Sequence, residues 1–215
     1  MPRQEPAPSA HRRRRGEGHV TREAILAAAR DLFLTEGYSQ TTVRRIVERA
    51  GVTPPVLYRH FADKEAILFE IADGAFHRLA AAFEAASGGG SPSLARLQRM
   101  MEAFLQFGLA HPAEYRVVFM SPDLVPKDVS HVMPPGSGRG EAGSRCFAML
   151  RDEVAALVAA GELVPEDPKV LAEAIWAAGH GLVALLITKP HFPWSDRAAL
   201  IHTMVAMPIE GLRRR

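Results

Sequence analysis

The sequence predicts an all-α protein of about nine helices, three short ones at the front and a larger helical body behind them. Apolar residues recur at helical spacing along most of the 215 residues. No segment alternates apolar and polar residues as a half-buried strand would. Hydrophobic residues make up 47% of the chain, which is enough for a full globular core in one or two domains.

The first 18 residues form a basic arm that is rich in Pro, Arg, Gly and Ser and has little to bury. We expect residues 1–18 to be disordered when free. The run Arg12 to Arg15 could follow a DNA backbone or enter a minor groove, or it could have no role. Residues 1–64 hold 12 Lys and Arg against 7 Asp and Glu, which favours a polyanionic partner for the front of the chain.

Three helices are predicted directly after the arm. Thr21 is expected to cap the first helix and Gly37 to end it. Thr42 is expected to cap the second, which closes at Gly51. The third lies in GVTPPVLYRHF, residues 51–61, after a short turn. This pairing of short helices is typical of a helix-turn-helix motif.

The third helix opens with two adjacent prolines, Pro54 and Pro55. Proline in the first turn breaks no helical hydrogen bond, because the first N–H groups have no partner within the helix. A residue before proline avoids the α region, so Thr53 and Pro54 should both be extended and the helix should start at Pro55. Neither proline can donate a hydrogen bond, so with Val56 they are expected to offer apolar contact, most naturally to thymine methyl groups.

The body begins with a long fourth helix that Asp63 should cap. The segment SGGGSPS, residues 87–93, interrupts the apolar pattern, and Pro92 is expected at the first position of a fifth helix. A short sixth helix is expected to start at residues 111–112. Residues 121–140 are rich in Pro and Gly, which favours a long, mobile loop.

Three more helices are predicted after this loop. The seventh should run from about Glu141 to Ala160, and the eighth from Asp167-Pro168 to about Thr188. Ser195 is expected to cap the ninth, which Pro208 should kink or end.

Residues 32–68, LFLTEGYSQTTVRRIVERAGVTPPVLYRHFADKEAIL, resemble the DNA-binding segment of TetR-family transcriptional regulators. HPAEYRVVF at 111–119 and IWAAGHGL at 175–182 look like a C-terminal domain type that is common in that family. The features that match the DNA-binding segment at fixed spacing are Phe33, Gly37-Tyr38, Thr41-Thr42-Val43, Ile46, Ala50-Gly51-Val52, Leu57-Tyr58, His60-Phe61 and Lys64-Glu65.

The resemblance implies two functional parts in each subunit of a homodimer. Residues 19–64 would form a helix-turn-helix DNA-binding head, and residues 65–215 a ligand-binding and dimerisation body. The last two long helices would form a four-helix interface with those of the partner. Double-stranded operator DNA and a small-molecule effector are the implied partners.

A helix-turn-helix places its second helix in the major groove. Leu57 and Phe61 are apolar and four residues apart, so they should face the core and turn Tyr58 outward. The resemblance implies that Tyr58 contacts DNA and that His60 and Lys64 contact phosphates. The candidate DNA contacts are Thr42, Arg44, Arg45, Pro54, Pro55, Val56, Tyr58, Arg59, His60 and Lys64.

Several of these residues also have a simpler interpretation. Arg44 lies where family members often reach a base edge, and a bidentate arginine–guanine contact is the commonest specific one. Arg44 and Arg45 could instead form an ordinary solvated face, and His60 could be an ordinary surface histidine. Thr42 could donate to a phosphate, and Arg45 and Arg59 are weaker candidates for the same role.

Aromatic and methionine side chains recur at helical spacing in the body. Any one of them is more often plain core than pocket lining. Together they exceed what a tight bundle needs, and methionine suits adaptable cavities, so we expect some to line a pocket for a largely apolar ligand. The candidate lining residues are Met101, Phe104, Phe107, Tyr115, Phe119, Phe147, Trp176 and His180. Gly179 and Gly181 beside His180 also indicate close helix approach.

Several classes of protein are excluded. There is no nucleophile elbow, phosphate loop or metal-spaced His or Cys cluster, so we expect no catalysis, no metal and no cofactor. The single cysteine, Cys146, excludes an intrachain disulfide and favours a reducing compartment. The best transmembrane candidate, Val183 to Ile187, is far too short, so we expect a cytoplasmic protein with no membrane partner.

The favoured function is a ligand-responsive transcriptional regulator. In the family's usual mode it would be a repressor that binds a palindromic operator as a homodimer and is released by a small, largely apolar ligand. The alternative is a ligand-binding or interaction module on the same scaffold without specific DNA readout. The two prolines keep this alternative open, because they remove hydrogen-bond donors from the helix that would read DNA.

Overall fold

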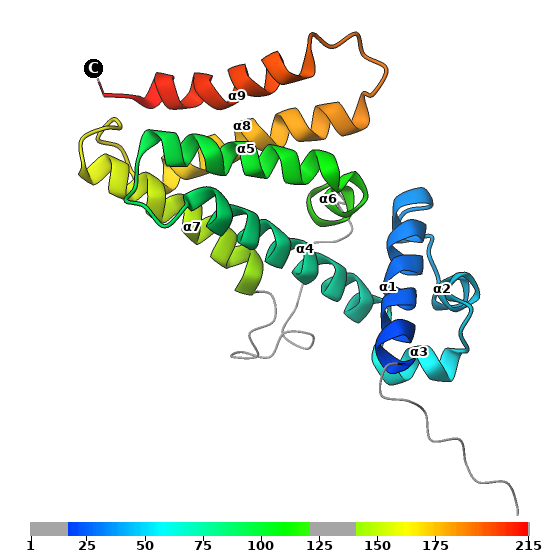
Figure 1. Ribbon diagram of the computed structural model, residues 1–215. Helices are drawn as coiled ribbons and strands as arrows, with labels where there is room; N and C mark the ends of the chain where they lie inside the picture. The colour runs from blue at the N-terminus through cyan, green and yellow to red at the C-terminus, as the bar shows by residue number, and fades with distance from the viewer. Residues whose placement is uncertain (1–16, 121–140, 215) are drawn as a thin grey trace, which may run out of the picture.

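The computed structural model describes residues 17–120 and 141–214, and within these ranges the regular structure consists of helices joined by turns and loops, with one isolated bridge between Leu163 and Arg213. The predicted all-α class is confirmed (Figure 1). The helices are α1 (Glu17–Thr35), α2 (Val43–Ala50), α3 (Pro54–His60), α4 (Lys64–Ser87), α5 (Leu94–Ala110), α6 (Pro112–Phe119), α7 (Glu141–Ala159), α8 (Pro168–Thr188) and α9 (Arg197–Leu212).

Two predicted segments fall largely outside this description. Residues 1–16 of the expected basic arm are not among the described residues, while residues 17 and 18 belong to α1. The expected loop at 121–140 also lies outside the described residues.

Helix ends with a strong local signal lie where the sequence predicts them. The Thr42 side chain accepts a hydrogen bond from the Arg45 backbone N–H, and Gly51 ends α2 with a φ of 64°. Asp63 caps α4, and Asp167 caps α8, each by accepting from a backbone N–H of the first turn. These caps satisfy N–H groups that have no partner within the helix.

Two helix starts differ from the prediction. α1 begins at Glu17, so Thr21 lies inside the helix rather than at its cap. Residues 17–20 contain no proline, so nothing within them prevents the helix from beginning before Thr21. α5 begins at Leu94 rather than at Pro92, because the Ser93 hydroxyl accepts from the Arg96 backbone N–H and sets the cap there.

The last helix also departs from the prediction. Asp196, not Ser195, caps α9 by accepting from the Ala199 backbone N–H. Pro208 does not end the helix, which continues to Leu212. Val205 and Ile209 lie on either side of the proline and are both buried, so their packing holds the last turn in place.

The start of α3 is one residue earlier than expected. The backbone N–H groups of Val56 and Leu57 both donate to the Thr53 carbonyl, at 2.9 and 3.1 Å. Thr53 is therefore the cap residue and Pro54 is the first helical residue. The restriction on a residue before proline is a preference, and here the burial of Leu57 against the head outweighs it.

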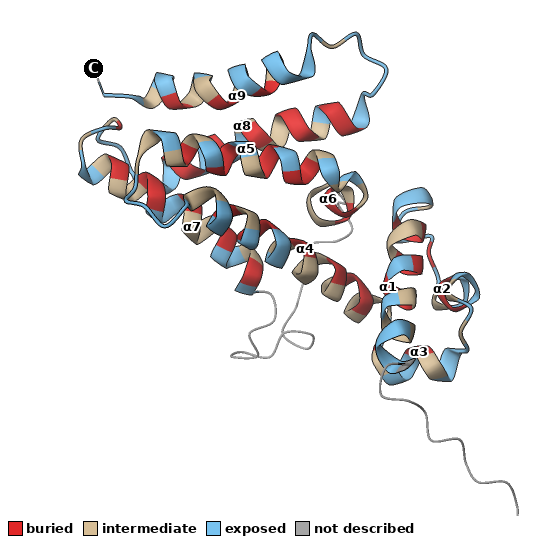
Figure 2. Cartoon of the chain, viewed as in Figure 1, coloured by how far each residue is buried: buried red, intermediate tan, exposed pale blue. Residues whose placement is uncertain are grey.

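The buried side chains form two separate hydrophobic clusters (Figure 2). The head cluster joins α1, α2 and α3 with the first turns of α4, and it also takes in Val117 from α6. The body cluster is built from α4 to α9. α4 therefore belongs to both clusters and connects them (Figure 1).

In the described ranges α8 is the one helix that is long and apolar enough to cross a membrane by length and composition. This corrects the expectation that no segment approaches such a length. The 18-residue window has a mean hydropathy of 1.8, because many small apolar residues flank Val183 to Ile187. Of this window 44% is buried, and α8 packs against α5, α7 and α9.

Candidate functional site

The outer surface of the head is formed by the start of α2 and by α3. Leu57 and Phe61 face the head core as predicted, and Tyr58 between them is 54% exposed. This alternation follows from helical spacing, because residues four apart share a face. The other predicted DNA contacts that are also exposed are Thr42, Arg44, Arg45, Pro54, Pro55 and Arg59. Val56, His60 and Lys64 are half-buried.

The arginines of α2 differ in their ion pairs. Arg45 pairs with Glu36, and Arg49 pairs with Asp31 of α1. Among the described residues, Arg44 forms no ion pair. Its guanidinium donors are not committed to a carboxylate in these ranges, and the predicted contact to a base edge stays a prediction.

Lys64 lies at the first position of α4 and connects this helix to the loop between α1 and α2. Its ammonium donates to the carbonyl oxygens of Tyr38 and Thr41, at 2.7 and 2.8 Å. It also lies 4.0 Å from the centre of the Tyr38 ring, a cation–π distance. Burial lowers the pKa of Lys64. The sequence offered no signal for these contacts, and the predicted phosphate contact of Lys64 stays a prediction.

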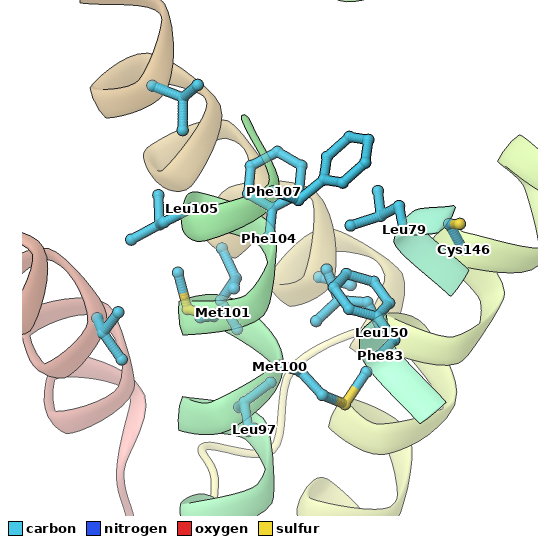
Figure 3. Close-up of a cluster of buried hydrophobic side chains, with 14 of the residues drawn as sticks. Leu79, Phe83, Leu97, Met100, Met101, Phe104, Leu105, Phe107, Cys146 and Leu150 are labelled. Carbon is cyan, nitrogen blue, oxygen red and sulfur yellow. The ribbon is translucent and has the colours of Figure 1, made fainter. Parts of the chain in front are cut away.

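The body contains a cavity of about 670 Å³ between α4, α5, α6, α7 and α8. In Figure 3, Phe83 of α4 and Leu150 of α7 lie beside Met100 of α5, and Leu79 of α4 lies beside Cys146 of α7; all of them line the cavity. The lining residues are Phe76, Leu79, Phe83, Met100, Met101, Phe104, Val118, Phe119, Gly143, Ser144, Cys146, Phe147, Ala148, Leu150, Arg151, Lys169, Ile175 and Trp176.

Five of the eight predicted lining residues reach this cavity: Met101, Phe104, Phe119, Phe147 and Trp176. The four aromatic residues of this set come from four different helices. The ring centre of Trp176 lies 6.4 Å from that of Phe119 and 6.1 Å from that of Phe147. Aromatic rings therefore contribute to the wall from several helices.

The other three, Phe107, Tyr115 and His180, are not among the described lining residues. The Tyr115 hydroxyl lies 2.8 Å from His180 Nδ1, and the two rings stack. Burial raises the pKa of Tyr115 and lowers the pKa of His180, so both groups are neutral at neutral pH when they share this hydrogen bond. Phe107 lies against His111 instead. Ligand contact by these three residues stays a prediction.

Cys146 lines the cavity, although the sequence analysis predicts no role for it beyond indicating a reducing compartment. Its thiol donates to the Phe76 carbonyl at 3.3 Å. Burial raises the pKa of Cys146 to about 11, so the sulfur is a protonated thiol at neutral pH. Cys146 lies on the inner face of α7 with Phe147 and Leu150, and this helical spacing could have predicted it as a lining residue.

α6 contacts both the head and the cavity. Val118 and Phe119 line the cavity, whereas Val117 is buried in the head cluster. The Glu114 carboxylate of α6 pairs with Arg30 of α1 and with Arg78 of α4. α6 is therefore in contact with the cavity, with α1 and with α4.

The described residues contain no group of three or more His, Cys, Asp or Glu side chains placed to hold a metal ion.

Two family models match the chain. The model for bacterial regulatory proteins of the tetR family covers residues 25–71, which are the head and the first turns of α4. The model for the tetracyclin repressor-like C-terminal domain covers residues 97–207, over half of the chain.

Curated relatives are similar over part of the chain. The chain is 37% identical over 84 residues to the HTH-type transcriptional regulator TcmR of Streptomyces glaucescens, which is 39% of this chain and 35% of TcmR. It is 32% identical over 111 residues to the HTH-type transcriptional regulator EthR of Mycolicibacterium smegmatis, which is 51% of each chain. The chain thus spans about half or less of the curated relatives it matches.

Solved structures share the fold over nearly the whole chain. A putative tetR family transcription regulator from Shewanella sp. PV-4 superposes with a TM-score of 0.71 at 22% identity, covering 91% of this chain and 99% of that one. The fatty acid degradation regulator FadR from Bacillus halodurans gives a TM-score of 0.73 at 18% identity, covering 94% and 100%. These likenesses show the arrangement of helices.

Proposed function

Because the chain belongs to the TetR family of transcriptional regulators, we propose that it is a repressor that binds a palindromic operator as a homodimer and is released by a small, largely apolar ligand. As a member of this family it is a helix-turn-helix regulator and not an enzyme. The observation that carries the proposal is the position of α6, which contacts both the head core and the cavity wall. DNA binding would place the protein in the cytoplasm.

The proposed DNA contacts follow the exposure of the head. Arg44 would reach a base edge, since its guanidinium has no ion pair among the described residues. Pro54, Pro55 and Val56 would offer apolar contact at the tip of α3, and Tyr58 would contact DNA from its outer side. The proposed phosphate contacts are Thr42, Arg45, Arg59, His60 and Lys64.

The proposed dimer interface is the outer side of α8 and α9. Val170 and Leu185 of α8 and Met207 of α9 are large apolar side chains that stay exposed in the single chain. Exposed apolar side chains on adjacent helices mark a protein interface. Two copies of this helix pair would form a four-helix interface related by a two-fold axis.

The proposed ligand response passes through α6. A ligand shifts an equilibrium only if it binds one arrangement better than the other. A ligand in contact with Val118 and Phe119 would favour one position of α6, and with it one position of Val117 and Glu114 against the head. The spacing of the two heads in a dimer would change as a result, and DNA affinity would fall.

The test is a genome-wide selection of fragments bound by the purified protein, followed by footprinting. A discrete palindromic site supports the proposal. Diffuse binding that weakens steeply with salt would show that only the phosphates are read. That outcome favours the alternative, a ligand-binding module on this scaffold without specific DNA readout.

A further inference from the structure

We propose that the ligand of the body cavity is an acidic amphiphile, an apolar molecule with one anionic group that Arg151 and Lys169 bind. The inference rests on the proposed function only in taking the cavity as the ligand site. It adds the chemical class of the ligand, which the apolar wall alone does not define.

The wall accepts an apolar body. Six of its lining side chains are aromatic rings, contributed by α4, α5, α6, α7 and α8, and most of the others are aliphatic or methionine. A cavity of about 670 Å³ lies within the range of sites for small molecules. A polar group on such a ligand must find a partner, because burying it without one costs free energy.

The charged side chains of the wall share one sign. Arg151 of α7 and Lys169 of α8 line the cavity, and no Asp or Glu is among its described lining residues. A ligand cation would therefore meet two like charges and no carboxylate among these lining residues. A carboxylate would meet a guanidinium, which matches its planar geometry, and an ammonium.

Both cations already have carboxylate neighbours on the surface. Arg151 Nε and Nη2 donate to Asp152 Oδ1 at 3.0 and 2.7 Å, and Lys169 Nζ lies 3.7 Å from Glu173 Oε1. The Arg151 and Lys169 side chains are 47% and 65% exposed. Exposed pairs of this kind contribute little stability, so a ligand carboxylate can replace them at small cost.

The neutral polar groups on the wall cannot take the place of Arg151 and Lys169 in binding an anionic group. The Cys146 thiol already donates to the Phe76 carbonyl and stays protonated at neutral pH. Ser144 is exposed and can serve one further polar group. Charge recognition in the cavity therefore depends on Arg151 and Lys169.

The test compares dodecanoate with 1-dodecanol, which share a chain and differ in charge. Binding to the DNA-free protein is measured by the change in tryptophan fluorescence, with both probes below their micelle or solubility limits. We expect dodecanoate to bind about tenfold or more tightly than 1-dodecanol, because it alone gains charge-assisted hydrogen bonds. In the double variant Arg151→Gln/Lys169→Gln this preference should fall to about twofold or less, with 1-dodecanol affinity unchanged.

Arg145→Gln is the matched control. Arg145 also lies on α7 and is exposed, but it pairs with Glu84 and is not a lining residue, so its loss should leave the preference intact. Equal affinity for the two probes overturns the inference, as does a preference that persists in the double variant. If neither probe binds, the inference is also overturned, because the cavity then does not accept a simple amphiphile. Circular dichroism checks that each variant is folded.

Measurements of probe binding and of DNA release distinguish an error in the ligand class from an error in the proposed function. If dodecanoate binds with the expected preference but leaves DNA affinity unchanged, the release mechanism is wrong and the ligand class stands. If 1-dodecanol releases DNA as effectively as dodecanoate does, release is supported and the ligand class is wrong.

Discussion

Glu114 on α6 and Arg30 on α1 form an ion pair across the junction of body and head, with Arg30 Nε 3.3 Å from Glu114 Oε1. The other carboxylate oxygen pairs with Arg78 on α4. The Glu114 side chain is only 8% exposed, so both arginines approach a carboxylate that has little access to water. Three helices thus meet at one buried charge.

Replacing Glu114 by Gln should loosen this junction. The amide keeps the shape of the side chain but loses the charge that holds both arginines. We expect unfolding free energy to fall by about 1–2 kcal/mol, a modest value because Arg30 and Arg78 remain partly solvated. Urea denaturation gives this quantity, and titration of the protein–DNA complex with ligand gives the coupling between sites, which should weaken.

Glu102→Gln is the control for Glu114→Gln, because Glu102 is an exposed carboxylate on α5. It should change neither stability nor coupling. If Glu114→Gln lowers stability yet leaves ligand-induced DNA release intact, the Glu114 contacts are purely structural.

Lys64→Met should destabilise the head. Methionine has similar length but no donors, so the Tyr38 and Thr41 carbonyls each lose a hydrogen bond that Lys64 now supplies. We expect a loss of roughly 1–3 kcal/mol in urea denaturation. The exposed residue Lys189 gives the control, Lys189→Met, which should be nearly neutral. A stable Lys64→Met protein whose DNA affinity depends less steeply on salt would instead identify Lys64 as a phosphate contact.

Arg44→Ala should relax operator specificity at one base pair. Loss of a bidentate contact to guanine is expected to reduce discrimination there by about 1–3 kcal/mol. Competition binding with operators substituted one base pair at a time measures this. A uniform loss over all operators, as expected for a phosphate contact, would contradict the assignment. Arg145→Ala removes the same charge from the body and should preserve the operator profile.

Gly108→Ala should destabilise the body by overpacking. A Cβ at Gly108 would lie 2.6 Å from Val183 Cγ1 and 2.9 Å from Tyr115 Cδ2, so α5, α6 and α8 must shift to admit a methyl group. We expect a loss of about 1–3 kcal/mol in urea denaturation. Gly181→Ala is the comparison, since a Cβ there meets no described atom within 4 Å outside its own helix backbone. It should be neutral or slightly stabilising.

Alkylation of Cys146 should report on the cavity. Only the thiolate reacts, and with a pKa of about 11 roughly one thiol in a thousand is ionised at pH 8. The rate with iodoacetamide should therefore be far below that of a free cysteine and rise about tenfold per pH unit up to the pKa. Mass spectrometry follows the single cysteine. A bound ligand should slow the reaction further, and a rate that is unaffected by ligand would argue against occupancy of this cavity.

The features of the fold that depend on local interactions could be predicted from the sequence. The caps at Thr42 and Asp63 each depend on a side chain and a backbone N–H three residues later, so spacing alone identifies them. The inward direction of Leu57 follows from helical periodicity in the same way. Where neighbouring signals compete, as Pro92 and Ser93 do, the sequence does not say which one sets the helix start.

Contacts between distant segments were not predictable in this way. Lys64 bonds to carbonyls 23 and 26 residues earlier, and no local pattern marks such a bond. Periodicity also identifies the inner face of a helix but not the space beyond it. Phe104 and Phe107 both belong to the inner face of α5, yet only Phe104 lines the cavity, because the cavity depends on how five helices pack.

The two prolines of α3 also have a consequence for the entropy of binding. With seven residues, α3 is too short to hold its shape alone in water. The pyrrolidine rings fix φ at its first two positions, so the unfolded chain has fewer conformations to lose there and the end that would meet DNA resists fraying. A helix that is preorganised by its covalent structure loses little backbone conformational entropy when it binds an operator. More of the interaction free energy then remains as affinity.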